Sequence, residues 1–130
     1  MSSEQIAVLV VEDEPLLRMD IAEALTDAGF TVFEAGDASE AIKIMSVNPQ
    51  IQALFTDIDM PGSIDGLKLA AFVKDRWPPI KIIVTSGHWK VTKDMLPPDG
   101  VFVRKPYQSH QIVKSIRELV SVSQVPKPEL

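Results

Sequence analysis

The sequence predicts an α/β protein built on a doubly wound sheet of five parallel strands. Short, wholly apolar runs rich in β-branched residues recur along the chain, and segments with helical spacing of apolar residues separate them. Uninterrupted apolar runs are typical of strands buried on both faces, as in parallel sheets. Strands that alternate with helices in this way favour a sheet with helices packed on both sides.

The first strand, the first helix and the second strand follow one another closely. Residues 6–11 form the first apolar run, and residues 30–34 are expected to form the second strand. Pro15 suits the first turn of a helix and Gly29 suits its end. Apolar residues recur at helical spacing between these two points: Leu16, Met19, Ala22, Ala24 and Leu25.

A capping motif and another apolar run mark the next helix and strand. Asp37 is followed three residues later by Glu40, which resembles a capping box at a helix start. This helix is expected to stop near residues 48–49, which are Asn-Pro. Residues 53–56 predict the third strand, which runs directly into Asp57.

The second half of the chain supplies the remaining two strands. A helix is expected to start after residues 65–66 and to end at Trp77. Residues 80–84 predict the fourth strand and residues 101–103 the fifth. An amphipathic helix over residues 108–120 completes the pattern.

The segment over residues 86–100 departs from this regular alternation. Pro-Pro-Asp-Gly at residues 97–100 breaks a helix, and the apolar periodicity before it is thin. We therefore expect a short or irregular fourth helix, over residues 91–96, followed by a loop.

Length and composition predict one domain of ordinary size, over residues 1–120. The chain has 130 residues, of which 45% are hydrophobic, and single domains commonly have ~100–150 residues. Such a chain buries a core without disulfide support. Residues 121–130, which include Pro126 and Pro128, are expected to form a disordered C-terminal tail.

Composition also disfavours several classes of protein. The absence of cysteine excludes a disulfide scaffold and a thiolate zinc site. A net charge of -5 disfavours nucleic-acid binding, which usually needs a basic surface. The longest apolar stretch, residues 6–11, is far shorter than the ~20 residues of a membrane helix, and no basic signal segment precedes it. We expect a cytoplasmic protein that contacts neither nucleic acid nor membrane.

Residues that carry chemistry follow four of the predicted strands. Glu12 and Asp13 follow the first strand, Asp57 ends the third, Thr85 follows the fourth, and Lys105 comes soon after the fifth. In a parallel sheet these strand ends meet at one edge, where doubly wound folds bind ligands. Carboxylates crowded there repel one another. A Mg²⁺ ion with open positions for phosphate oxygens resolves that conflict.

This ordered set resembles the receiver domain of bacterial response regulators in two-component signalling. The resemblance covers about residues 6–120 and includes the acidic pair, Asp57 with Met-Pro at residues 60–61, Thr85, and Lys-Pro at residues 105–106. It implies a flavodoxin-like (β/α)5 receiver fold. The irregular fourth helix resembles a branch of stand-alone, single-domain receivers.

The resemblance implies a role for each residue near the phosphoryl group. Asp57 would be the phosphoacceptor, because a carboxylate is a competent nucleophile toward phosphorus. Lys105 and Thr85 would contact the transferred group. Phe102 would be the switch aromatic, turning inward when Thr85 moves toward the phosphoryl group.

The resemblance also implies a Mg²⁺ site. Its ligands would be Glu12, Asp13, Asp57 and the backbone carbonyl of Asp59. Glu12 stands where many receivers have Asp, which changes the reach of the carboxylate and keeps its charge. Asp59 adds a further negative side chain close to the site.

The implied function is that of a single-domain response regulator, phosphorylated on Asp57 in a Mg²⁺-dependent reaction. The donor would be a sensor histidine kinase or a histidine phosphotransferase, and the output would be contact with an unknown downstream protein. The chain would be no enzyme beyond catalysing its own phosphorylation and dephosphorylation.

Two alternatives remain open at this point. A pseudo-receiver would keep the fold as a protein-binding module and would never use phosphate. An aspartyl-phosphate phosphatase would use Asp57 as nucleophile and Asp59 as acid/base, since the Asp-x-Asp spacing matches that class.

Overall fold

The computed structural model describes residues 5–59, 66–87 and 91–124, with side chains up to Ser121. The strands are β1 (Ala7–Val11), β2 (Thr31–Ala35), β3 (Ile51–Asp57), β4 (Lys81–Ser86) and β5 (Val101–Arg104). The helices are α1 (Pro15–Asp27), α2 (Ala38–Val47), α3 (Gly66–Arg76) and α4 (Ser109–Gln124). A single turn of 3-10 helix, η1 (Lys93–Met95), lies between β4 and β5.

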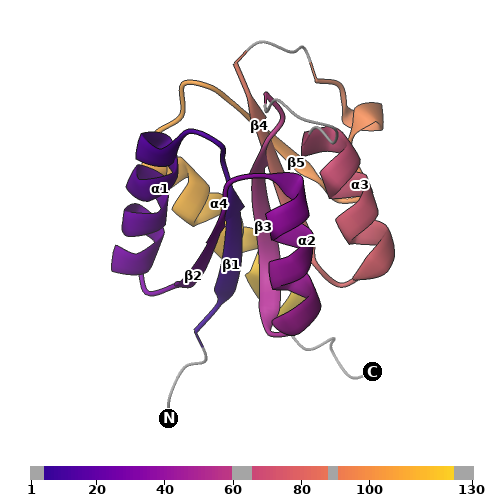
Figure 1. Ribbon diagram of the computed structural model, residues 1–130, viewed down its shortest axis with the longest axis horizontal. Helices are drawn as coiled ribbons and strands as arrows, with labels where there is room; N and C mark the ends of the chain where they lie inside the picture. The colour runs from indigo at the N-terminus through magenta and orange to yellow at the C-terminus, as the bar shows by residue number, and fades with distance from the viewer. Residues whose placement is uncertain (1–4, 60–65, 88–90, 125–130) are drawn as a thin grey trace.

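The five strands form one parallel sheet in the order β2-β1-β3-β4-β5 (Figure 1). The chain moves outward from β1 to β2, then crosses to β3 on the other side of β1. The strand order therefore reverses between the two central strands, β1 and β3, and the doubly wound class predicted from the sequence is confirmed. Their carboxyl ends open toward the crevice where such folds bind ligands.

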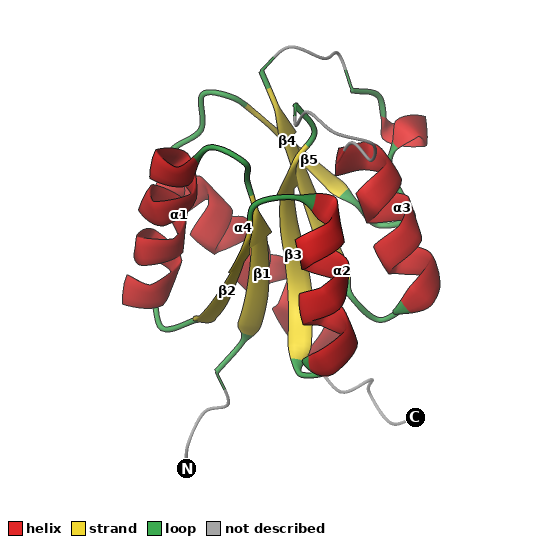
Figure 2. Cartoon of the chain, viewed as in Figure 1, coloured by secondary structure: helices red, strands yellow, loops and turns green. Residues whose placement is uncertain are grey.

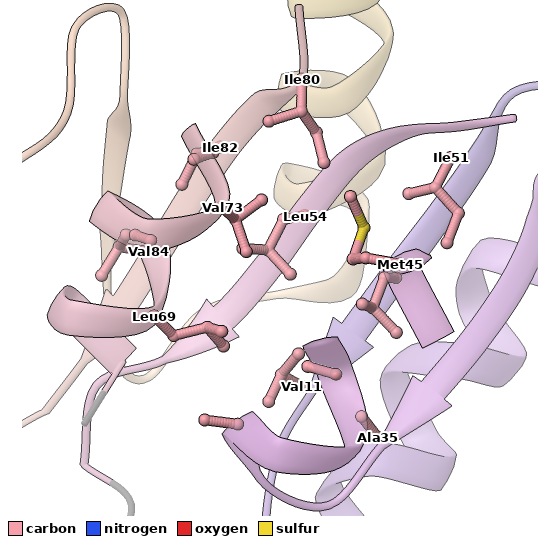
Figure 3. Packing of buried hydrophobic residues seen from close by; sticks show 14 of the residues in the cluster. Val11, Ala35, Met45, Ile51, Leu54, Leu69, Val73, Ile80, Ile82 and Val84 are labelled. Carbon is pink, nitrogen blue, oxygen red and sulfur yellow. The ribbon is translucent and has the colours of Figure 1, made fainter. Parts of the chain in front are cut away.

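Helices cover both faces of the sheet (Figure 2). On one face, α1 and α4 pack against a buried cluster that includes Ile21, Phe55 and Ile112. On the other face, α2 and α3 cover a second cluster, in which Met45, Leu54 and several β-branched residues interlock (Figure 3). Burial on both faces explains why the strands are uninterrupted apolar runs in the sequence.

The short, irregular fourth helix is confirmed for the residues that can be placed. Between β4 and β5 the described chain has η1 alone, a turn too short to cover the sheet as α2 and α3 do. Residues 88–90, which belong to the predicted irregular segment, lie outside the described residues. The Pro-Pro-Asp-Gly sequence at residues 97–100 follows η1 and leads directly into β5.

Several boundaries differ from the sequence-based expectation. β3 is longer than predicted, because Ile51 and Gln52 join it before the predicted run begins. α4 continues to Gln124, four residues past the expected end of the helix at residue 120, because residues 121–124 contain no helix breaker. The tail itself, residues 125–130, lies outside the described residues, so its disorder remains a prediction.

The apolar pattern of α1 is only partly buried. Leu25 and Ala22 face the core, whereas Leu16 and Met19 are 73% and 63% exposed. Helical spacing alone did not distinguish the two faces, because α1 carries apolar residues on both. The exposed apolar residues lie in its first turns, close to the carboxyl ends of the strands.

Candidate functional site

The acidic residues predicted from the sequence meet at the carboxyl-end edge, the edge of the sheet where β1, β3, β4 and β5 end. Glu12, Asp13 and Asp57 each offer a carboxylate oxygen, and these oxygens lie within 4.8 Å of one another. Glu12 and Asp57 are 3% and 2% exposed, and Asp13 is nearer the solvent. Among the described residues this is a group of acids arranged to hold a metal ion.

Asp57 is held by hydrogen bonds to both of its carboxylate oxygens. Lys105 Nζ lies 2.8 Å from Oδ2, and the backbone N–H of Asp59 donates to Oδ1 at 2.9 Å. Lys105 also lies 3.8 Å from Glu12 Oε1. Burial is the largest single effect and lowers the pKa of the Lys105 ammonium, but the bond to Asp57 and the charges of the nearby acids together raise the net pKa. Lys105 is therefore a permanent cation at this site.

Glu12 is the acid with the least favourable surroundings. Burial, followed by repulsion from Asp57, raises its pKa from the ordinary value of 4.5 to about 7, against the lowering effect of the Glu14 N–H bond. Its backbone carbonyl accepts a bond from Arg18 Nη1 at 2.8 Å, which fixes the start of α1 relative to β1. A bound divalent cation would relieve this repulsion.

Thr85 lies directly beside Asp57, since the two residues pair in register across β3 and β4. Its side chain is fully buried, and its Oγ1 has no hydrogen-bond partner. A buried hydroxyl without a partner costs about 1–3 kcal/mol. Such a group at the end of a strand is available to a ligand that brings an acceptor.

Asp59 turns its side chain toward β4. Its carboxylate accepts a bond from Ser86 Oγ at 2.8 Å and one from the Gly87 N–H at 3.0 Å. The sequence placed Asp59 near the site but did not identify Ser86 or Gly87 as its partners. A hydroxyl next to Thr85 was the available signal, and only the chain fold brings it to Asp59.

Phe102 and Tyr107 lie on either side of Lys105 in the chain. Phe102 is half-buried on β5, in register with Val84, so its role as a switch remains a prediction. Tyr107, which sequence analysis did not single out, packs edge-on against Phe55. Burial, with repulsion from the nearby acids, raises the pKa of its phenol to about 12.

Gly66 explains how α3 approaches the site so closely. A Cβ at this position would meet the carbonyl of Asp57 and lie 2.7 Å from Ile58 Cα. A side chain is excluded there, because the first residue of α3 packs directly against the end of β3. The predicted start of this helix is confirmed, and its glycine serves packing.

A family model for the response regulator receiver domain matches residues 8–117. The match runs from β1 into α4, and it contains every residue of the site described above. The chain belongs to this family. The resemblance seen in the sequence is therefore confirmed, and the flavodoxin-like receiver fold agrees with it.

Curated relatives contain a receiver segment similar to this chain within longer proteins. An NtrX-like response regulator of Rickettsia felis is 32% identical over 130 residues, which cover 97% of this chain and 27% of that protein. The sensor kinase CckA of Brucella abortus is 33% identical over 117 residues, covering 87% of this chain and 12% of that protein. The chain thus spans about a quarter or less of these relatives.

Solved receiver structures share the architecture. A response regulator receiver protein from Sinorhizobium medicae superposes with a TM-score of 0.86 at 28% identity, covering 95% of this chain and all of that one. The receiver domain of the hybrid histidine kinase CckA gives a TM-score of 0.76 at 28% identity, covering 88% and 98%. In the part of this receiver that is described, no helix has the length and apolar character of a membrane span.

Proposed function

We propose that this receiver accepts a phosphoryl group on Asp57 and thereby switches a protein contact. The observation that carries the proposal is the 2.8 Å contact between Lys105 Nζ and Oδ2 of the nearly buried Asp57. A cation at this distance offsets part of the cost of burying a carboxylate away from water. It also offers a fixed positive charge to phosphoryl oxygens without reorganisation.

The acidic cluster supports a Mg²⁺ site made by Glu12, Asp13, Asp57 and the backbone carbonyl of Asp59. The fit rests on the convergence of the three carboxylates and on the raised pKa of Glu12, to which burial contributes most and repulsion from Asp57 contributes further. Magnesium prefers oxygen ligands and keeps several waters. When bound it would neutralise charge on the phosphoryl oxygens during transfer.

In the proposed transfer, an Oδ atom of Asp57 attacks the phosphorus of a phosphohistidine. The O–P bond forms as the P–N bond breaks, and its electron pair returns to the imidazole nitrogen. The histidine leaves neutral, because its other ring nitrogen carries a proton. Lys105 then pairs with a phosphoryl oxygen of the acyl phosphate instead of with the free carboxylate.

Thr85 would respond to the product. Its unpartnered hydroxyl lies beside Asp57, and the phosphoryl group brings three strong acceptor oxygens. A new hydrogen bond would remove the cost of the buried free hydroxyl and favour a shifted end of β4. Phe102 on the neighbouring strand would repack in the second arrangement.

A histidine kinase or histidine phosphotransferase is the proposed donor. Leu16, Leu17 and Met19 are exposed apolar residues of α1, and Leu17 lines a cavity of about 490 Å³ together with Gly87 and Lys105. A donor must rest beside this opening to bring its imidazole to Asp57. Exposed apolar residues there are suited to binding an amphipathic helix.

The position of Asp59 argues against the phosphatase alternative. A general acid/base must reach the leaving group or the attacking water, but this carboxylate is bonded to Ser86 and Gly87. The pseudo-receiver alternative predicts no phosphorylation at all. Both alternatives can be tested in one experiment.

That experiment is intact-mass measurement after incubation with acetyl phosphate and Mg²⁺. The proposal predicts the gain of one phosphoryl group, which requires Mg²⁺ and is absent in Asp57→Asn. Asp27→Asn, which removes an exposed charge at the far end of α1, serves as the matched control and should be phosphorylated normally. If neither acetyl phosphate nor a panel of phosphorylated histidine proteins modifies the chain, the pseudo-receiver explanation replaces the proposal. Continuous release of phosphate from an aryl phosphate would instead support the phosphatase.

A further inference from the structure

The ends of β3, β4 and β5 are linked by a closed ring of hydrogen bonds. Asp57 Oδ1 accepts from the Asp59 N–H, and the Asp59 carboxylate accepts from Ser86 Oγ and the Gly87 N–H. The Ser86 carbonyl accepts from the Lys105 N–H at 3.0 Å. Lys105 Nζ returns to Asp57 Oδ2 at 2.8 Å. Both oxygens of the proposed phosphoacceptor thus belong to the ring.

Asp59 supplies the side chain that closes this ring. Its carboxylate binds donors on two consecutive residues, and hydrogen bonds to an ionised acceptor are the stronger kind. The two bonds fix the Ser86–Gly87 turn, in which Ser86 is fully buried. Within the ring, the carboxylate of Asp59 is the side chain that connects the end of β3 to this turn.

The Ser86–Gly87 turn also fixes the aliphatic part of the Lys105 side chain. A Cβ on Gly87 would lie 3.3 Å from Lys105 Cβ and 3.7 Å from its Cδ, so bare backbone packs against the lysine. A displacement of Gly87 would therefore move or release Lys105. The position of the Lys105 ammonium beside Asp57 therefore depends on the carboxylate of Asp59, two residues after Asp57 in the chain.

Thr85 and Ser86 both lie at the end of β4, but their hydroxyl groups differ in hydrogen bonding. The Ser86 hydroxyl is bonded to Asp59, whereas the Thr85 hydroxyl has no partner. Phosphorylation would replace the single charge of the Asp57 carboxylate by a phosphoryl group with about 1.5 to 2 negative charges, next to the Asp59 amide. It would repel the Asp59 carboxylate and at the same time offer an acceptor to Thr85. One hydroxyl would lose its partner as the other gains one.

We propose that Asp59 is a positioning residue whose carboxylate holds the Ser86–Gly87 turn, and with it Lys105, until phosphorylation of Asp57 releases it. The holding function stands on the contacts alone. The release rests on the proposed function of Asp57. This assigns to Asp59 a regulatory role separate from its backbone carbonyl, which is the proposed metal ligand.

The holding function is tested by amide exchange of Gly87, measured by NMR on the full chain without Mg²⁺. We expect Asp59→Ala to accelerate exchange of the Gly87 amide about tenfold or more, and Asp59→Asn, which keeps one acceptor but loses the charge, to have a smaller effect. Asp27→Asn, at the far end of α1, is the control of equal charge and should leave Gly87 unchanged. Unchanged Gly87 exchange in both Asp59 variants would overturn the proposal.

The release is tested by the same measurement after phosphorylation with acetyl phosphate and Mg²⁺. Gly87 exchange should accelerate about tenfold in the wild type, and should not accelerate further in Asp59→Ala. Sustained protection of Gly87 in a chain whose mass shows the phosphoryl group would overturn the release. A chain that gains no phosphoryl group would refute the proposed function and the release with it, while the exchange data without Mg²⁺ would still decide the holding function.

Discussion

In the middle of the sheet the buried side chains are apolar and packed on both faces. At its carboxyl end several buried side chains are polar, and not all of them have a favourable charge or hydrogen-bond partner. Leu9, Leu54 and Ile83 have no exposed surface and belong to the two apolar clusters on the faces of the sheet. By contrast, the buried polar residues of the described chain cluster at the strand ends: Glu12, Thr56, Asp57, Thr85 and Ser86.

This difference shows where the molecule gives up stability for function. Glu12 is buried with a raised pKa, and Thr85 has a hydroxyl without a partner. Both features cost free energy of folding. The apolar middle supplies the stability of the fold, and under the proposed function a bound cation and a phosphoryl group would satisfy both. Four predictions test this contrast, from the largest effect to the smallest.

Truncation in the middle of the sheet should cost the most. Leu54→Ala is expected to lower the free energy of unfolding by about 2–5 kcal/mol, because it leaves a cavity between α3 and the sheet. Leu16→Ala removes the same atoms from a side chain that is 73% exposed and should change stability by less than about 0.5 kcal/mol. Urea denaturation measures both. Equal effects of the two substitutions would mean that the packing of Leu54 contributes no more to stability than that of the exposed Leu16.

Removal of a charge at the carboxyl end should stabilise the protein, and only above the ordinary pKa of Glu12. Below 4.5 the carboxyl is neutral in both states, so Glu12→Gln should have no effect. As the pH rises toward 7 the unfolded state ionises first, and the wild type loses stability. Above 7, without Mg²⁺, Glu12→Gln should be more stable by about 1 to 3 kcal/mol. Glu23→Gln, on the exposed side of α1, is the control; a benefit from Glu12→Gln that does not vary with pH would contradict the assignment.

Two buried threonines should respond to the same substitution with opposite sign. Thr56 donates to the Asp57 carbonyl at 3.2 Å, so Thr56→Val should cost about 1 kcal/mol. Thr85→Val removes a hydroxyl without a partner and should raise stability by up to about 1 kcal/mol. Urea denaturation without Mg²⁺ measures the pair. A loss at both positions would show that the Thr85 hydroxyl is satisfied in solution.

The smallest effect concerns Tyr107, whose titration reports the field of the carboxyl end. It is the single tyrosine of the chain, so phenolate absorbance observes it alone. Its pKa is raised to about 12 by burial and by Glu12, Asp57 and Asp20. Because the raised pKa favours the neutral phenol in the folded state, stability should fall as the pH passes from about 10 to about 12. Asp57→Asn should lower this pKa slightly, and an unchanged value would mean that burial acts alone.

The sequence predicted the sheet, its parallel order and the convergence of the acids, because all three depend on local signals. Apolar runs mark buried strands, and parallel strands bring Glu12, Asp57 and Lys105 to one edge. The partners of individual polar groups depend on distances across the fold. The Ser86 hydroxyl next to Thr85 was therefore visible in the sequence, but the bonds that Ser86 and Gly87 donate to Asp59 could not be predicted from it.

Surface exposure along α1 was also beyond the sequence. Leu16 and Met19 fit the helical spacing as well as Leu25 does, yet only Leu25 is buried. Which face of an amphipathic helix meets the sheet depends on its crossing direction, which residue spacing does not specify. The end of α4 differs, because residues 121–124 contain no helix breaker and the helix continues to Gln124.

The most direct test of the contrast between the two ends is the effect of Mg²⁺ on the free energy of unfolding. At about pH 8, where Glu12 is ionised, millimolar Mg²⁺ should raise the stability of the wild type by about 1 kcal/mol or more. Asp57→Asn should lose most of this gain, while Leu54→Ala should keep it on a less stable fold. Equal gains in the wild type and Asp57→Asn, or no gain in either, would contradict the claim that the carboxyl end is built around a cation.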